Sequence, residues 1–137
     1  MAQQIAIIGS GALGTALSKI FVDTGQFFSQ WDVDQTRPRT HATAPAAVEL
    51  ADVVLLCIPT NAIASAAASI ESHLKPGAMV VSLSKGLDRD SGLTVDQLLM
   101  KYFPKHLVAL LSGPMLATEL VAGKVGIGVL ATQSRSA

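Results

Sequence analysis

The chain has 137 residues, which is enough for one domain with a proper core and too short for two domains of ordinary size. Half of the residues are hydrophobic, but only 4% are aromatic and 15% charged, so the core must be aliphatic, as in a parallel sheet covered by helices on both faces. Lys plus Arg and Asp plus Glu number 10 each, and this balance, without any basic run, excludes the electrostatic footprint of a nucleic-acid-binding protein.

The mean hydropathy of +0.45 raises the question of a membrane segment. The most apolar stretch, 53–70, is interrupted by Pro59 and by polar residues, which indicates a strand and a helix rather than a span. No basic-then-apolar leader precedes Gln4, so we expect a cytoplasmic protein without a membrane partner. The single cysteine, Cys57, cannot form an intramolecular disulfide, and its apolar neighbours indicate a small buried side chain.

The chain begins with a short apolar strand, 4–8, that runs directly into a glycine-rich turn and a helix. In a G-x-G-x-x-G turn, Gly9 permits the tight exit from the strand, Gly11 lets a pyrophosphate approach the backbone, and Gly14 lets the helix lie close to the sheet. The free N–H groups at the start of the helix face the phosphates. We therefore predict dinucleotide binding here, the alternative being a purely structural turn. The predicted cofactor contacts of this turn are Gly9, Ser10, Gly11, Ala12, Leu13 and Gly14.

A second strand is expected over 27–32, and it ends on an acidic residue. In a dinucleotide fold, the acid at the tip of the second strand accepts hydrogen bonds from the adenine ribose and repels a 2′-phosphate, so Asp32 favours NAD over NADP. Other interpretations stay open. Asp32 opens a turn, or Asp34 takes the ribose role, or Arg37 and Arg39 receive a 2′-phosphate so that NADP is the cofactor.

The middle of the chain contains a further candidate position for ligand binding. A short helix over 46–51 leads to a continuous apolar run, 53–58, that is typical of a buried parallel strand. Pro59 then lies at the carboxyl edge of the sheet, where ligands bind in open α/β folds, and is a predicted cofactor contact. Asn61 is expected to cap a helix over 62–74, a structural role at least as plausible as a ligand contact.

The next strand, 78–83, runs into Lys85. A lysine at the carboxyl end of a central strand points into the same crevice as the glycine turn, so Lys85 is the best candidate for a substrate or cofactor contact, against the alternative of a solvated loop lysine.

The remaining elements are a helix over 93–103, a buried strand over 107–111, a short helix over 118–122 and a last strand over 125–131. We therefore predict one domain over residues 1–131 and a polar tail over 132–137. The three histidines and the one cysteine are scattered along the chain, so the sequence offers no cluster of metal ligands.

Three stretches in this order resemble one family: GSGALGTA at 9–16, SLSKGL at 82–87 and LSGPMLATE at 111–119. They are similar to the N-terminal half of NAD(P)-dependent sn-glycerol-3-phosphate dehydrogenase, and Trp31 and Pro59 fit the same pattern. The resemblance implies a Rossmann-type α/β fold with a doubly wound, mainly parallel sheet. It also implies hydride transfer between NAD(P)H and dihydroxyacetone phosphate, a small phosphorylated substrate.

The resemblance also assigns roles to individual residues. Ala12 and Leu13 would lie against the cofactor diphosphate, and Lys85 would contact both cofactor and substrate. The positions that line the substrate and the nicotinamide would be Gly113, Met115 and Ala117, the last counted as a cofactor contact. Because the family has a small polar residue where this chain has Met115, one hydrogen bond to the substrate would be missing.

The family keeps its proton-donating lysine and most phosphate contacts in a helical C-terminal domain, which these residues lack, so we expect no catalysis from them alone. The edge that this domain would cover is apolar, and we expect a homodimer or other self-association through Pro59, Leu87, Pro114 and Leu116. The alternatives are a domain of another Rossmann dehydrogenase, of hydroxy-acid or ketopantoate type, and a non-catalytic nucleotide-binding module.

Overall fold

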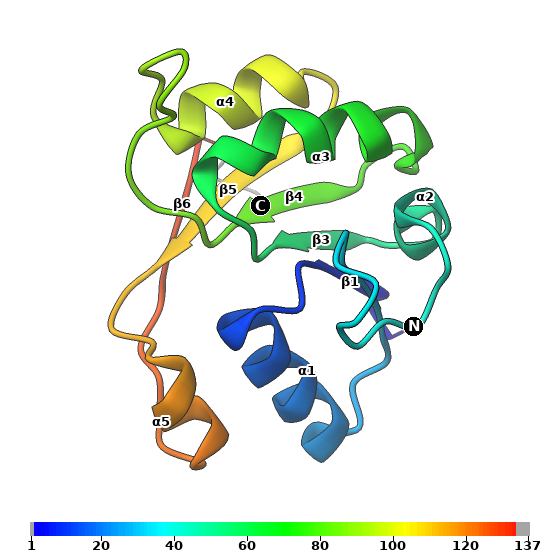
Figure 1. Ribbon diagram of the computed structural model, residues 1–137, viewed down its shortest axis with the longest axis vertical. Helices are drawn as coiled ribbons and strands as arrows, with labels where there is room; N and C mark the ends of the chain where they lie inside the picture. The colour runs from blue at the N-terminus through cyan, green and yellow to red at the C-terminus, as the bar shows by residue number, and fades with distance from the viewer. Residues whose placement is uncertain (1, 134–137) are drawn as a thin grey trace.

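The computed structural model describes residues 2–133, which form a six-stranded sheet with helices on both faces (Figure 1). The strands are β1 (Ile5–Ile8), β2 (Phe28–Trp31), β3 (Val53–Leu56), β4 (Met79–Ser82), β5 (Leu107–Ser112) and β6 (Val129–Thr132). The helices are α1 (Ala12–Thr24), α2 (Ala44–Val48), α3 (Ile63–Ile70), α4 (Val95–Tyr102) and α5 (Ala117–Val121), with short 3-10 helices η1 (Thr60–Ala62) and η2 (Glu71–His73).

The strand order is β2-β1-β3-β4-β5-β6. The first five strands in the chain pair in parallel, and only β6 runs antiparallel, against β5. From β1 the chain first moves outward to β2 and then returns to the other side of β1 at β3, so the direction of winding reverses beside β1. This is the Rossmann-type doubly wound sheet that the sequence predicts, and its ligand crevice lies where the order reverses, at the carboxyl ends of the strands.

Each face of the sheet has its own core, because side chains alternate along a strand. In β1, Ala6 and Ile8 pack with α2, α3 and α4, whereas Ile7 packs on the opposite face with α1. Figure 1 shows the same division, with α3 and α4 on one side of the sheet and α1 on the other. The apolar runs of β1 and β3 are buried on both faces, so these two strands give the crevice a rigid floor.

Helix α1 ends as the sequence signals predict. Gly25 adopts φ 71°, a left-handed conformation that glycine reaches without steric cost, and its N–H donates to the carbonyl of Val22. At the start of α4, the backbone N–H of Thr94 donates to Oε1 of Gln97 at 3.0 Å, an interaction that satisfies a donor outside the helical hydrogen-bond pattern.

The structure corrects the helix expected over 62–74. Helix α3 ends at Ile70, and Asn61 lies inside η1 instead of capping the helix, so that prediction is wrong. The physical reason is Pro59, whose carbonyl accepts the N–H of Ala62 at 2.9 Å and thereby starts a tighter turn before α3 begins. The polar side chain that organises this corner is Thr60, which is buried.

Two further boundaries shift. Helix α2 starts earlier than expected, because Thr43 Oγ1 accepts the N–H of Ala46 at 3.3 Å and Pro45 suits the first turn. Strand β6 begins only at Val129, after a segment with Gly126 and Gly128, residues that weaken a strand.

Candidate functional site

The glycine turn between β1 and α1 is tightly packed at two of its three glycines. Gly9 has φ +106°, and a Cβ built there would lie 2.3 Å from the carbonyl oxygen of Cys57 in the loop after β3. A Cβ on Gly14 would lie 1.9 Å from the carbonyl oxygen of Gly9. By contrast, no atom lies within 4 Å of a Cβ built on Gly11. The space beside Gly11 is therefore open to a ligand, as the sequence motif predicts.

The N-terminus of α1 offers backbone donors to that space. Gly11 is the N-cap, no side chain makes a capping hydrogen bond, and no acidic residue occupies the first turn. The N–H groups of Ala12 and Leu13 belong to this first turn, where a helix has no internal acceptors and its dipole is positive. An anion placed against Gly11 would satisfy these groups. The side chain of Leu13 itself packs into the core beside Ile7.

Asp32 lies beside the glycine turn, directly after β2. Its Oδ2 accepts the backbone N–H of Ser10 at 2.6 Å, and its Oδ1 accepts the N–H of Asp34 at 2.8 Å. Each carboxylate oxygen can accept more than one hydrogen bond, so these contacts orient Asp32 without using up its acceptors. The sequence left open whether Asp32 forms a turn or binds the ribose. These contacts allow Asp32 to do both.

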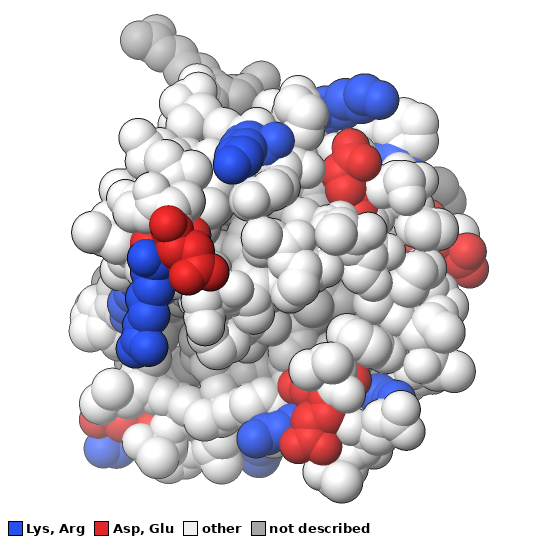
Figure 2. All heavy atoms as spheres, turned by 45° about the horizontal axis from the view of Figure 1, so that its top comes forward, with Lys and Arg blue, Asp and Glu red and all other residues white. Residues whose placement is uncertain are grey.

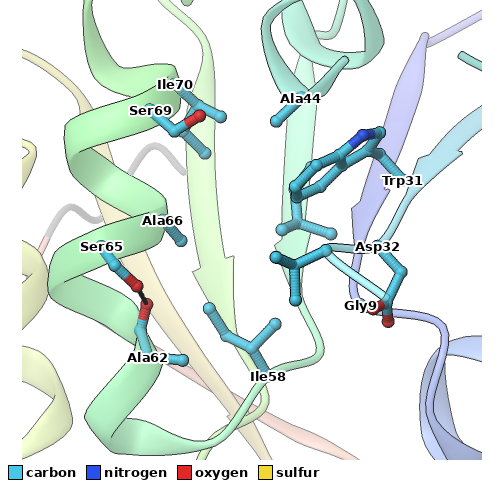
Figure 3. A pocket seen from close by; sticks show the side chains of 12 residues that line it. Gly9, Trp31, Asp32, Ala44, Ile58, Ala62, Ser65, Ala66, Ser69 and Ile70 are labelled. Atoms are coloured by element: carbon cyan, nitrogen blue, oxygen red, sulfur yellow. Dashed lines mark hydrogen bonds between the residues drawn. The ribbon is translucent and has the colours of Figure 1, made fainter. Parts of the chain in front are cut away.

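A cavity of about 270 Å³ opens between the end of β2 and α3 (Figure 3). Trp31 forms one wall, and Ala62, Ser65 and Ala66 form the opposite wall, while Asp32 lies at one end beside Gly9. The indole of Trp31 is fixed by a 3.3 Å hydrogen bond from its Nε1 to the carbonyl of Ala42. A largely apolar slot with an acid at its end suits a flat heteroaromatic ring attached to a ribose.

A second cavity, of about 470 Å³, lies between the glycine turn and α5. Four predicted cofactor contacts, from the glycine turn and from α5, line this cavity together with the side chain of Arg37. The lining residues are Ser10, Gly11, Ala12, Thr15, Arg37, Ala117, Thr118 and Val121.

Pro59 and Lys85 share a third cavity, of about 370 Å³, at the carboxyl ends of β3 and β4. Thr60 Oγ1 donates to the carbonyl of Lys85 at 2.7 Å, which ties the two loops together. Lys85 is exposed, and within residues 2–133 no carboxylate lies within ion-pair distance of its ammonium group. Arg89 lines the same cavity, and sequence reasoning missed it because no motif marks it.

Gly113 and Met115 are not brought into the cavity that holds Lys85. Gly113 has φ +137°, and a Cβ there would lie 2.4 Å from the carbonyl oxygen of Ile127, so glycine is required by close packing of the chain. The sulfur of Met115 lies 3.4 Å from the position that a Cβ on Gly128 would occupy, so Met115 is next to Gly128. Contact of these two residues with a substrate stays a prediction.

Cys57 is mostly buried below the glycine turn, and burial raises the pKa of its thiol to about 12. It therefore behaves as the small hydrophobic side chain that the sequence indicates, and not as a nucleophile at neutral pH.

Within residues 2–133, no group of three or more His, Cys, Asp or Glu side chains is arranged to hold a metal ion. None of the helices in that range has the length and apolar character needed to cross a bilayer. On the face shown in Figure 2, acidic and basic side chains stand in small groups of both signs, separated by uncharged surface. That face carries no broad single-sign field of the kind that binds a polyanion.

Comparisons with known proteins identify the family of this chain. Residues 39–137 match the family described as NAD-dependent glycerol-3-phosphate dehydrogenase N-terminus. Glycerol-3-phosphate dehydrogenase [NAD(P)+] of Corynebacterium urealyticum is 28% identical over 154 residues, a match that covers 95% of this chain and 46% of the relative. The chain thus spans about half the length of such relatives.

Solved structures share the fold. Glycerol-3-phosphate dehydrogenase from Coxiella burnetii superposes with a TM-score of 0.87 at 22% identity, covering 98% of this chain and 48% of that one. The 3-hydroxyisobutyrate dehydrogenase of Mycobacterium tuberculosis superposes with a TM-score of 0.77 at 19% identity, covering 99% of this chain and 48% of that one.

Proposed function

Since the chain belongs to the NAD-dependent glycerol-3-phosphate dehydrogenase family, as its N-terminal, NAD(P)-binding part, we propose that it holds the nicotinamide dinucleotide for hydride transfer between NAD(P)H and dihydroxyacetone phosphate. The observation that carries this proposal is the open space at Gly11, which lies before uncapped backbone donors and beside two cavities along the same sheet edge.

Each cavity would hold a different part of the cofactor. The slot between Trp31 and α3 would hold the adenine, and the N–H groups of Ala12 and Leu13 would hold the diphosphate. The cavity of Pro59 and Lys85 would receive the nicotinamide end. Asp32, at the end of the adenine slot, accepts hydrogen bonds from the ribose hydroxyls, which favours NAD over NADP.

Lys85 is the residue of this chain that acts on the substrate. The chemistry that a nicotinamide held by these residues would supply is transfer of a hydride. The ammonium group of Lys85, which has no carboxylate partner among residues 2–133, holds a substrate phosphate or stabilises negative charge as it develops on the carbonyl oxygen. We assign no proton donor among these residues, so ligand binding, and not turnover, is the property to measure.

A dehydrogenase acting on a hydroxy acid is the second candidate. Met115 stands where the resembling family has a small polar residue, and the solved 3-hydroxyisobutyrate dehydrogenase shares the fold. Measurements of ligand binding distinguish the two candidate functions. Binding of dihydroxyacetone phosphate to the protein saturated with NADH, and its loss in Lys85→Ala, supports the first, whereas selective binding of 3-hydroxyisobutyrate to the protein saturated with NAD supports the second.

Calorimetric titration with NADH tests the proposal. We expect a dissociation constant on the order of micromolar, and a fluorescence change of Trp31, the single tryptophan of the chain, on binding. Gly11→Val should abolish both signals while the protein stays folded, because no atom lies within 4 Å of the new Cβ. Ser72→Val, in η2 and outside the three cavities, is the control and should bind normally. Unchanged binding in Gly11→Val would contradict the proposal.

The proposal also covers the assembly of the chain and its location in the cell. The edge residues Leu87 and Leu116 are 61% and 62% exposed, so we propose that this chain self-associates or forms a homodimer through them. A cytoplasmic location stays a prediction.

A further inference from the structure

Ser10, the residue between the first two glycines of the turn, is held by the segment that follows β2. It is 2% exposed, its N–H donates to Asp32, and its hydroxyl donates to the carbonyl of Pro38 at 2.7 Å. Its carbonyl accepts Nη1 of Arg37 at 3.1 Å and Oγ1 of Thr15 at 3.0 Å. The position of the glycine turn therefore depends on the side chains of Asp32 and Arg37 and on the backbone carbonyl of Pro38, all more than twenty residues further along the chain.

Arg37 and Asp32 serve different cavities, although only five positions separate them. Asp32 lines the slot with Trp31, where the proposed ribose lies, and Arg37 does not. Arg37 lines the cavity that Gly11 and Ala12 share with α5, where the proposed diphosphate lies, and Asp32 does not. Arg37 thus lines the cavity proposed for the diphosphate and does not line the slot proposed for the ribose.

The charge of Arg37 is only partly compensated. Its Nε lies 3.4 Å from Oδ2 of Asp34, and both side chains are 46% exposed. Hydrogen bonds from the hydroxyl and N–H of Thr36, with a smaller contribution from Arg37, hold the pKa of Asp34 below its ordinary value. The Nη2 edge of Arg37 makes no hydrogen bond within residues 2–133.

We propose that Arg37 is a positioning residue for the diphosphate. It fixes the glycine turn through the carbonyl of Ser10 and places a positive charge in the cavity lined by Gly11 and Ala12. It therefore strengthens binding of NADH and NADPH equally and does not select between them. This inference rests on the proposed dinucleotide binding.

Affinities of Arg37→Gln for four probes test the inference: NADH, NADPH, ADP and adenosine. Because a half-exposed, charge-assisted hydrogen bond and a nearby cation are lost, we expect about a tenfold weaker affinity for NADH, NADPH and ADP alike. Adenosine lacks phosphate, and its affinity should not change, which shows that the Trp31 slot is intact. Arg37→Lys should recover part of the ADP affinity by restoring the charge. Lys19→Gln removes an α1 cation that lines none of the three cavities and is the control.

A larger loss for NADPH than for NADH would overturn the inference and make Arg37 a reader of the 2′-phosphate. Equal affinities of wild type and Arg37→Gln for all four probes would also overturn it. If the wild type binds none of them, the proposed function fails, and amide hydrogen exchange of the unliganded protein still decides the positioning role. Arg37→Gln should speed exchange of the Ser10 N–H, which Asp32 protects, at least threefold, and unchanged exchange there would reject the role.

Discussion

The backbone N–H of Ser10 donates a 2.6 Å hydrogen bond to Oδ2 of Asp32 and so joins the glycine turn after β1 to the tip of β2. The acid that the proposed function assigns to the ribose is therefore also a support of the loop that would bind the diphosphate. A substitution at Asp32 changes a charge and a structural contact together, and the two effects must be separated by the choice of variant.

Asp32→Asn removes the charge but keeps an oxygen that accepts the N–H of Ser10. We expect the ratio of NADH to NADPH affinity to fall about tenfold, because a negative charge at the end of the adenine slot no longer repels a 2′-phosphate. Asp32→Ala removes both backbone hydrogen bonds of the carboxylate and should lower the melting temperature more than Asp32→Asn, which loses only one of the two acceptor oxygens. Asp23→Asn, which removes a carboxylate of α1 that lines none of the three cavities, is the control. An unaltered affinity ratio in Asp32→Asn would show that this acid does not choose the cofactor.

Gly14→Ala should destabilise the fold severely. The added Cβ would lie 1.9 Å from the carbonyl oxygen of Gly9, and backbone on both sides cannot yield cheaply. We expect a loss of about 3 kcal/mol or more in the free energy of unfolding, measured by urea denaturation. The matched variant Gly11→Ala meets no atom within 4 Å and should cost about 1 kcal/mol at most, the difference between glycine and alanine as an N-cap. Equal losses in the two variants would mean that the turn is not packed as described.

Cys57 should react slowly while the protein is folded. Burial raises the pKa of its thiol from 9.0 to about 12, so the folded state holds the proton that the unfolded state releases above pH 9. Its contribution to stability is complete below pH 9 and is lost as the pH rises toward 12. Urea titrations should therefore show a steeper fall in stability above pH 9 than in Cys57→Ala. A thiol reagent at about pH 8 should modify the protein only after denaturant is added. Rapid modification of the native protein would contradict the burial.

Self-association should depend on the carboxyl edge of the sheet. We expect light scattering of the wild type to give a mass above that of one chain, and Leu87→Ser combined with Leu116→Ser to return it to the monomer. Val22→Ser removes an apolar side chain of α1 that is 68% exposed, outside that edge, and should leave the mass unchanged. A monomeric wild type at high concentration would refute the association.

Much of the fold and part of the candidate site follow from local sequence. The apolar run 5–8, the glycine turn and the helix after it are neighbours in the chain, and each is specified by side-chain period or backbone freedom. Buried parallel strands have continuous aliphatic sequences, and the two such runs over 53–58 and 78–83 contain β3 and β4. The carboxyl edge that holds Pro59 and Lys85 then follows from the parallel arrangement alone.

Tertiary structure decided what depends on residues distant in sequence. Asn61 has the chemistry of a helix cap, but the turn that starts at Pro59 begins the 3-10 helix before it. Asp32 and Arg37 look alike as candidates for the ribose end, and only the path of the chain after β2 puts them in separate cavities on either side of Ser10. Sequence determines which groups a short segment offers. Their partners are set by packing between segments, because hydrogen bonds and charges act over a few ångströms regardless of separation along the chain.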